Sequence, residues 1–247
     1  MKKSRRLISG GNEVILEVDE IHTFYGKSQV LEGVSLGIEE GEIVTLVGRN
    51  GVGKSTTLKS IVGLTPPQKG SIRFKGEEVS RLRPYKICWR GIGYVPEERR
   101  IFPHLTVRQN ILVGMKPGQR VEQPWTIEKI YSCFPQLEKR DGQKGGTLSG
   151  GEQQMLTISR TLAGNPELLL VDEPTEGLSP LLVEIVIQIL QQINGEGRSI
   201  LLVEHSIDVA LGLAARAYVM SKGKIVFGGT SQGLYENKEV QKKYLEV

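Results

Sequence analysis

The chain has 247 residues and a formal net charge of +4, which is enough length to bury a core but too little and too scattered a charge for a nucleic-acid binder. Cys88 and Cys133 stand apart from each other and from any histidine at metal spacing, which argues against a disulfide framework and fits a reducing compartment. No apolar run reaches the roughly 18 residues of a membrane span, and no export signal follows the basic residues 1–6. We expect one composite, soluble domain without a nucleic-acid partner.

The first elements expected are strands between residues 14 and 38. Val34, Leu36 and Ile38 alternate with small or polar residues, which is the period of a half-buried strand, and short antiparallel pairing is expected there. Tyr25 ends one such segment. Considered alone, it is most simply an aromatic residue of the sheet, because aromatic residues are common in strands.

Residues 48–55 read G-x-x-x-x-G-K-S and fit a phosphate-binding loop. An apolar run at 43–47 predicts a strand buried on both faces before the loop, and a helix that stops at Gly63 is expected after it. A glycine-rich turn is the alternative, but it needs no such strand and helix around it. In a phosphate loop the backbone N–H groups point at phosphate, Lys54 reaches the terminal phosphates and Ser55 binds Mg²⁺. The predicted nucleotide-binding residues of this loop are Gly48, Arg49, Asn50, Gly51, Val52, Gly53, Lys54, Ser55 and Thr56.

Two short strand candidates follow the first helix, at residues 71–74 and 92–95. Glu97 comes directly after the second candidate. The stretch from 98 to 146 alternates prolines, charges and helical patches, and therefore predicts a mostly helical insertion.

Residues 148–154, Leu-Ser-Gly-Gly-Glu-Gln-Gln, lead into a helix that is expected to end near Gly164. Ser149, Gly150 and Gly151 stand at the start of this helix, where backbone N–H groups are unpaired and the helix dipole is positive. These residues form either a simple helix cap, which is the default, or a second anion site.

Residues 168–171 predict another buried strand, which ends in Asp172 and Glu173. Acids at the carboxyl end of a central parallel strand lie where open α/β sheets bind ligands. One acid can serve Mg²⁺ while the other acts on water, and a solvated acidic turn is the alternative.

A helix at 180–193 and a buried strand at 200–203 are expected next, with Glu204 and His205 at the end of the strand. A single histidine at a strand end is more often structural than catalytic, so this residue alone does not indicate a function. The tail predicts a short helix, a hairpin turn at 221–224 and a charged terminal helix.

With the phosphate loop, the L-S-G-G-E-Q stretch, the acidic strand end and His205 in this order, the chain resembles the ATP-binding subunit of an ABC transporter from about Val14 onward. The L-S-G-G-E-Q signature is the specific feature, because many unrelated NTPases share the other motifs. Finer features resemble the branched-chain amino-acid importer ATPases. These features lie at residues 94–97, 100–103, 151–156 and 176–178.

The resemblance implies an α/β fold, a P-loop NTPase of ABC type with a mainly parallel core sheet, an antiparallel β subdomain and a helical subdomain. It divides the chain into an N-terminal tail at 1–12 and a single ABC ATPase domain at 13–247. Within that domain, 13–97 and 166–247 would form the nucleotide-binding core, and 98–165 would form the helical subdomain with the signature.

The resemblance also implies the ligands, ATP and Mg²⁺. Tyr25 would stack on adenine, and Lys54 and Ser55 would bind the phosphates and Mg²⁺. Asp172 would hold the metal, and Glu97 would contact the metal and the water.

Hydrolysis would depend on Glu173, which would polarise the attacking water, on His205, which would position the γ-phosphate, and on Lys54. Two subunits of the family enclose two ATP molecules, so residues 149–151 of one protomer would meet the nucleotide of the other. The expected partners are an identical or paralogous ABC ATPase subunit and integral-membrane permease subunits. The chain would then be cytoplasmic and peripheral, held at the inner face of the cell membrane through the permease.

Two positions depart from the general family pattern, and a third departs from the branched-chain group. Glu97 stands where most members have glutamine, a departure that the branched-chain group shares, and Ser179 stands where aspartate is usual. His205 is the general family residue, whereas the branched-chain group often has glutamine. An importer ATPase for urea or an amide and a nucleotide-switched soluble assembly module are the alternatives. A GTPase or kinase is disfavoured, because residues 237–240 lack the aspartate of a guanine-reading N-K-x-D.

Overall fold

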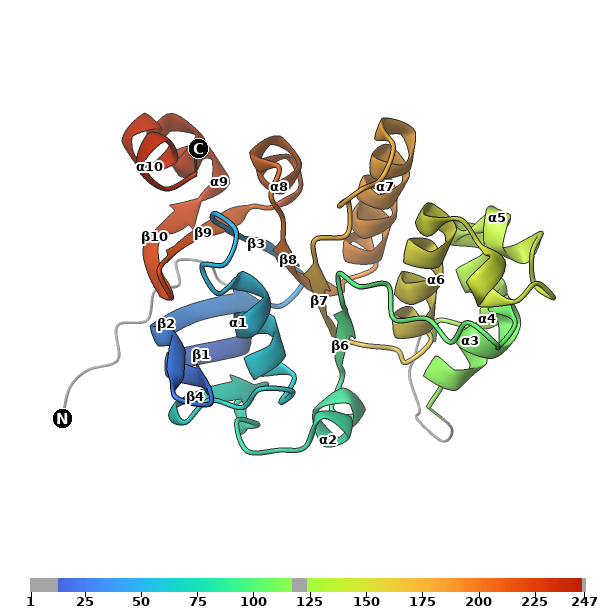
Figure 1. Ribbon diagram of the computed structural model, residues 1–247, viewed down its shortest axis with the longest axis horizontal. Helices are drawn as coiled ribbons and strands as arrows, with labels where there is room; N and C mark the ends of the chain where they lie inside the picture. The colour runs from blue at the N-terminus through green and yellow to red at the C-terminus, as the bar shows by residue number, and fades with distance from the viewer. Residues whose placement is uncertain (1–12, 117–123, 246–247) are drawn as a thin grey trace.

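The computed structural model describes residues 13–116 and 124–245. Two sheets and their helices make up this part of the chain (Figure 1). The strands are β1 (Val14–Tyr25), β2 (Ser28–Glu39), β3 (Ile43–Val47), β4 (Lys69–Phe74), β5 (Glu77–Glu78), β6 (Ile92–Val95), β7 (Leu168–Asp172), β8 (Ser199–Val203), β9 (Arg216–Ser221) and β10 (Lys224–Thr230). The α-helices are α1 (Lys54–Ile61), α2 (Pro84–Trp89), α3 (Val107–Gly114), α4 (Ile127–Cys133), α5 (Pro135–Glu138), α6 (Gly150–Leu162), α7 (Pro180–Gly195), α8 (Ile207–Leu213), α9 (Ser231–Glu236) and α10 (Lys238–Tyr244), and a short 3-10 helix spans Gly145–Thr147.

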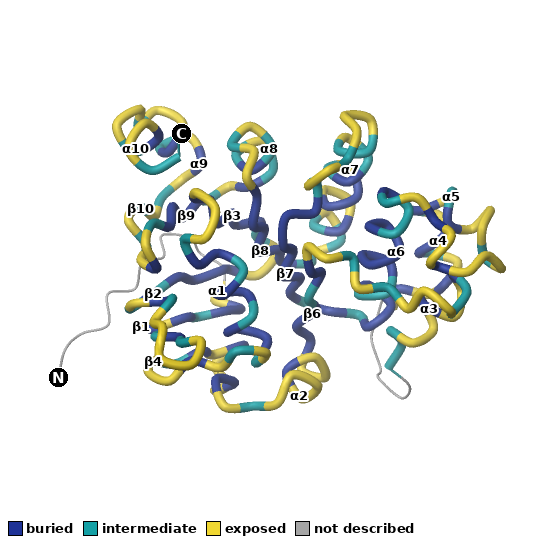
Figure 2. The backbone as a smooth tube through the Cα atoms, in the orientation of Figure 1, coloured by how far each residue is buried: buried dark blue, intermediate teal, exposed yellow. Residues whose placement is uncertain are grey.

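The central sheet has the strand order β10-β9-β3-β8-β7-β6. Its neighbours from β9 to β6 are parallel, and β10 runs antiparallel to β9. Every residue of β3, β7 and β8 is buried, which confirms the strands predicted from continuous apolar runs. Alternate side chains of β7 enter different cores, because Leu169 and Val171 pack with α6 and α7 while Leu168 and Leu170 pack toward α1 and the second sheet. Figure 2 shows this centre as buried.

The second sheet is antiparallel and has the order β2-β1-β4-β5. The expected alternating strands are present, but the expectation of short pairing was wrong, since β1 and β2 each have 12 residues. Register shifts along β1 explain the length, because bulges let a long strand bend while its apolar side chains still face the core. The predicted fold class, a mainly parallel core sheet with an antiparallel β part and a helical part, is confirmed.

The described residues between β6 and β7 form helices and connecting loops, as expected, and lie beside the central sheet on the right of Figure 1. Thr106 and Gln109 form a capping box that begins α3, and Ser149 and Glu152 form another that begins α6. Trp125 is buried inside this group. Among the described helices, none combines the length and the apolar character needed to cross a bilayer.

The parallel strands bring the predicted site residues together. The carboxyl ends of β3, β6, β7 and β8 lie at one edge of the sheet, so the segments that follow them are neighbours although they are far apart in the sequence. These segments carry the phosphate loop, Glu97, Glu173 and His205.

Candidate functional site

The loop between β3 and α1 depends on glycine at two positions. Gly48 has a φ of +155°, and a Cβ there would lie 2.4 Å from the carbonyl oxygen of Met220. Gly53 has a φ of +114°, and a Cβ there would lie 2.8 Å from Leu31 Cδ2. A side chain at either position would collide with a neighbouring strand, so this tight loop path requires glycine.

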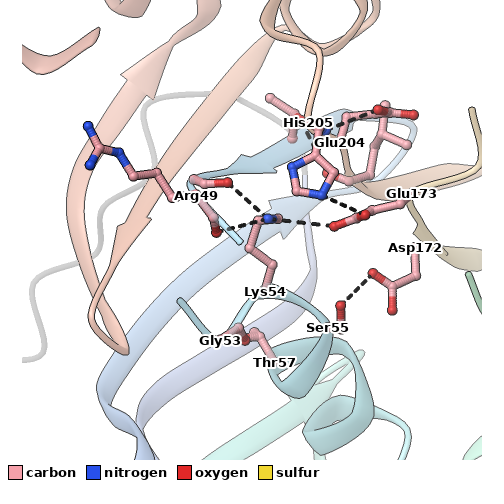
Figure 3. Close-up of polar contacts among 12 residues, drawn as sticks. Arg49, Gly53, Lys54, Ser55, Thr57, Asp172, Glu173, Glu204 and His205 are labelled. Carbon is pink, nitrogen blue, oxygen red and sulfur yellow. Dashed lines mark hydrogen bonds and ion pairs between the residues drawn. The ribbon is translucent and has the colours of Figure 1, made fainter. Parts of the chain in front are cut away.

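Lys54 is the first residue of α1 and is buried, with 4% of its surface exposed. Figure 3 shows its ammonium between the loop and Glu173. Its Nζ donates hydrogen bonds to the carbonyl oxygens of Gly48 at 2.9 Å and Arg49 at 3.2 Å, and it lies 3.6 Å from Glu173 Oε1. Burial lowers the pKa of Lys54, and the nearby carboxylate of Glu173 opposes this effect. The ammonium is therefore held at the centre of the loop, where phosphate oxygens can replace the carbonyl groups.

Asp172 ends β7 and is nearly fully buried, with 1% exposed. Its Oδ1 accepts a hydrogen bond from Ser55 Oγ at 3.0 Å, and its Oδ2 accepts one from the Tyr94 hydroxyl at 3.0 Å. Burial raises the pKa of Asp172, and the two hydrogen bonds oppose the rise. The adjoining carboxylate and hydroxyl oxygens are the hard donors that Mg²⁺ prefers, so these residues fit that metal.

Glu173 directly follows Asp172 but points toward Lys54 and His205, as Figure 3 shows. Its Oε2 lies 2.7 Å from His205 Nε2, and its backbone N–H donates to the carbonyl of Val203 in β8 at 2.9 Å. Glu173 has a φ of +46°, a conformation that is uncommon for a residue other than glycine. The unusual backbone turns two consecutive acids toward different partners, which suits them to different tasks.

Glu204 connects the segment that follows β7 with the segment that follows β8. It is 2% exposed, and it accepts hydrogen bonds from Thr175 Oγ1 at 2.7 Å and from the His205 N–H at 3.1 Å. Burial raises the pKa of Glu204, and these bonds oppose the rise. The carboxylate thus ties the loop after β7 to the start of the segment after β8.

A cavity of about 300 Å³ opens over these groups. Its polar lining brings together the predicted residues Lys54, Ser55, Glu97, Glu173 and His205. The remaining lining residues are Val30, Asn50, Gly51, Gly53, Thr56 and Glu176. A cavity with a buried ammonium, a hydroxyl and several carboxylates at a helix N-terminus is suited to a phosphate group and its metal ion.

The other predicted residues lie elsewhere. Tyr25 stands at the end of β1 with 48% of its surface exposed and does not line the cavity. Ser149, Gly150 and Gly151 begin α6 and are also absent from the lining. Ser149 accepts a hydrogen bond from the Glu152 N–H and caps the helix, so within one chain the default interpretation of a helix cap describes its contacts.

Three contributors to the site were not predicted from the sequence. Val30 and Glu176 line the cavity, and Tyr94 holds Asp172. One oxygen each of Glu173 and Glu176 and one ring nitrogen of His205 lie within 4.8 Å of one another. Glu176 entered the sequence analysis only through the resemblance of residues 176–178 to the branched-chain group, and Tyr94 only through that of residues 94–97. Neither residue carried a sequence signal for its contact in the site.

Comparison with known proteins identifies the family of this chain. The family model for ABC transporters matches residues 31–176, more than half of the chain, and includes the phosphate loop, the signature, and Asp172 and Glu173. The chain belongs to the ABC transporter family. This ABC ATPase binds ATP and hydrolyses it to drive a membrane transporter, and subunits of the family dimerise and pair with membrane permeases.

Three similar proteins illustrate the match. The chain is 43% identical over 231 residues to the high-affinity branched-chain amino acid transport ATP-binding protein BraG of Pseudomonas aeruginosa, covering 94% of this chain and 99% of BraG. It is 35% identical over 237 residues to the lipopolysaccharide export system ATP-binding protein LptB of Haemophilus influenzae, covering 94% and 97%. A solved dimeric post-hydrolysis state of the ATP-binding cassette MJ0796, bound to ADP and Pi, has a TM-score of 0.76 and 27% identity, covering 87% and 98%.

Proposed function

We propose that this ABC ATPase powers an importer for branched-chain amino acids. The observation that carries the proposal is the 43% identity to BraG along nearly the whole of both chains. Glu97 supports it, because the branched-chain group shares this departure from the usual glutamine. The match to LptB favours lipopolysaccharide export as a second candidate, since an ABC ATPase does not itself contact the transported solute.

In the proposed reaction, the loop at 48–56 holds the phosphates of ATP through its N–H groups and Lys54. Ser55 and Asp172 hold Mg²⁺, which supplies positive charge that screens the triphosphate, and Glu97 faces the same cavity. Tyr25 stacks on adenine from outside the cavity. The burial of Asp172 and its hydrogen bond with Ser55 support the assignment of Mg²⁺ to these two residues.

We assign the chemistry of hydrolysis to Glu173 and His205. Glu173 accepts the proton of the attacking water, while His205 and Lys54 bind the γ-phosphate as charge moves onto it. The 2.7 Å contact between Glu173 and His205 supports the assignment, because it keeps the base and the phosphate-binding group side by side. Phosphoryl transfer needs this kind of positioning more than it needs covalent catalysis.

The proposed assembly is a homodimer or a heterodimer with a paralogue, in which residues 149–151 meet the nucleotide of the other subunit. The permease holds the dimer at the cytoplasmic face of the membrane. We propose that 13–97 and 166–247 form the nucleotide-binding core and 98–165 the helical subdomain that contacts the permease. The proposed N-terminal tail, 1–12, lies outside the described residues.

The test is purification of the tagged chain from its native membranes, identification of the copurifying permease, and measurement of solute uptake. We expect the complex to take up labelled leucine, isoleucine and valine in an ATP-dependent way, and uptake should be lost in Lys54→Ala. Uptake of urea or an amide instead, or copurification with a lipopolysaccharide export permease, would assign another transporter. Recovery with soluble proteins alone would favour the assembly module and would contradict an importer.

A further inference from the structure

Arg99 occupies an unusual position between three functional segments. It lies in the segment that joins β6 to α3, two residues after Glu97, and its φ of +47° is uncommon for a residue other than glycine. Its Nη2 donates a hydrogen bond to the carbonyl oxygen of Glu176 at 2.9 Å, in the loop that follows β7. Strained backbone of this kind is found preferentially at functional sites.

The guanidinium of Arg99 also lies against the first residue of α6. A Cβ on Gly150 would be 2.4 Å from Arg99 Nη1, and a Cβ on Gly177 would be 3.6 Å from Arg99 Nη2. Gly150 therefore leaves room for the guanidinium beside the signature turn, whereas a side chain at Gly177 would make only an ordinary van der Waals contact with it. In Figure 1 the green segment after β6 leaves the sheet on the side of α6.

Arg99 places a positive charge beside the positive end of a helix. The start of α6 is the positive end of a helix of 13 residues, where a cation is unfavourable unless an anion is present. Glu152, the acid of that first turn, pairs with Arg140 and caps Ser149. Among the described residues no carboxylate forms an ion pair with Arg99, and one of the five donors of its guanidinium is used, on Glu176.

We infer that Arg99 is a nucleotide-binding residue that acts across the dimer. Together with the free N–H groups at the start of α6, its guanidinium takes up the terminal phosphate of the ATP held by the partner subunit. The inference rests on the proposed dimer, in which the signature turn meets that phosphate. Arg99 does not line the cavity that holds Lys54 and Ser55 in its own chain, so we expect ATP binding by a separate subunit not to depend on it. An arginine suits the task because its planar donors match phosphate oxygens.

The test compares Arg99→Ala, Arg99→Lys and the control Arg100→Ala, all in a Glu173→Gln background that removes turnover. Arg100 is a suitable control, because its side chain is 62% exposed and pairs with Glu98 on the surface. ATP affinity is measured on dilute, monomeric protein with a fluorescent ATP, and dimer formation with Mg-ATP by sedimentation. We expect Arg99→Ala to bind ATP as the parent does but to dimerise about tenfold or more weakly, as for the loss of a charged hydrogen bond. Arg99→Lys should recover part of the loss, and Arg100→Ala should match the parent.

Three outcomes would overturn the role of Arg99 without contradicting the proposed dimer. Equal dimerisation of Arg99→Ala and the parent would show that the guanidinium does not contact the phosphate. Stronger dimerisation would show that Arg99 instead stabilises the separate subunit, by holding the loop after β7 against the start of α6. A loss of ATP affinity in the monomer would assign a role within its own chain. If the parent with intact Arg99 stayed monomeric with Mg-ATP, the proposed dimer itself would fail.

Discussion

Two carboxylates that line the cavity, Glu173 and Glu97, differ in how firmly the fold holds them. Glu173 is 9% exposed, touches Lys54 and His205, and follows a buried strand directly. Glu97 is exposed in the segment after β6. A general base must stay within hydrogen-bond reach of its water, which favours the fixed residue.

We therefore expect Glu173→Gln to lower hydrolysis by about 100-fold or more, the contribution typical of a general base, while ATP binding is kept. The amide keeps the shape of the side chain but cannot take the proton. Glu97→Gln should hydrolyse ATP within about tenfold of the wild type, a barrier change of roughly 1.4 kcal/mol. Single-turnover hydrolysis by both variants distinguishes them. If Glu97→Gln were inactive and Glu173→Gln still turned over, the two roles would have to be exchanged.

Asp172, the proposed ligand of Mg²⁺, also affects the stability of the fold. Burial raises its pKa above the ordinary 3.8, so its contribution to folding is greatest below that value and is lost as the pH rises through the folded pKa. Asp172→Asn avoids this loss, so its free energy of unfolding relative to the wild type should increase as the pH rises above about 4, although hydrolysis is lost. Glu42 and Glu204 also have raised pKa values. The wild type and the Asp172→Asn variant both contain these residues, so their contributions cancel in the difference between the two free energies of unfolding. Urea unfolding at several pH values measures the difference, and a difference that is flat or falls with pH would contradict the argument.

At the scale of the element, the phosphate loop is held by contacts that its motif does not reveal. Gly48→Ala forces a methyl group toward the Met220 carbonyl, whereas Gly51, with a φ of +74°, has nothing within 4 Å of its missing Cβ. We expect Gly48→Ala to lower the free energy of unfolding by about 1–3 kcal/mol more than Gly51→Ala, as for overpacking of a rigid site. Denaturant unfolding without nucleotide measures both, and equal losses would mean that backbone strain alone explains the requirement for glycine.

Some elements and contacts of the fold could be predicted from the sequence, and others could not. Continuous apolar runs predict β3 and β7 because strands covered on both faces need no polar positions. The length of β1 was missed, because its bulges depend on the shape of the core beneath it. The motifs predicted the acids at 172 and 173, but the Tyr94 contact joins residues 78 positions apart and depends on the pairing of β6 with β7. The side chains of Asp172 and Glu173 contact different partners because Glu173 has a positive φ, and glutamate rarely adopts that backbone conformation.

At the scale of the whole molecule, the signature lies outside the cavity of its own chain, which a dimer would explain. Ser149→Phe should leave ATP binding by a separate subunit intact and block ATP-driven dimerisation, because its ring fills the place of the partner's phosphate. Ser149→Ala is the matched control, since both variants lose the helix cap, a cost of about 1 kcal/mol, but alanine leaves the space open. Sedimentation with and without Mg-ATP gives the answer. A Ser149→Phe variant that dimerised normally would remove the case for a signature that acts on the other subunit.

The place of β3 in the sheet has a consequence for synthesis of the protein. Both strands that flank it, β8 and β9, come from the last fifth of the chain, and the carbonyl that packs against Gly48 belongs to Met220. At translation rates of about 5–20 residues per second, roughly 10–30 s separate the emergence of the phosphate loop from that of its supporting strands. During that interval an apolar strand is on the ribosome without its neighbours. The nascent chain therefore needs protection from aggregation, and ribosome-bound chains that end before β9 should not be retained on immobilised ATP.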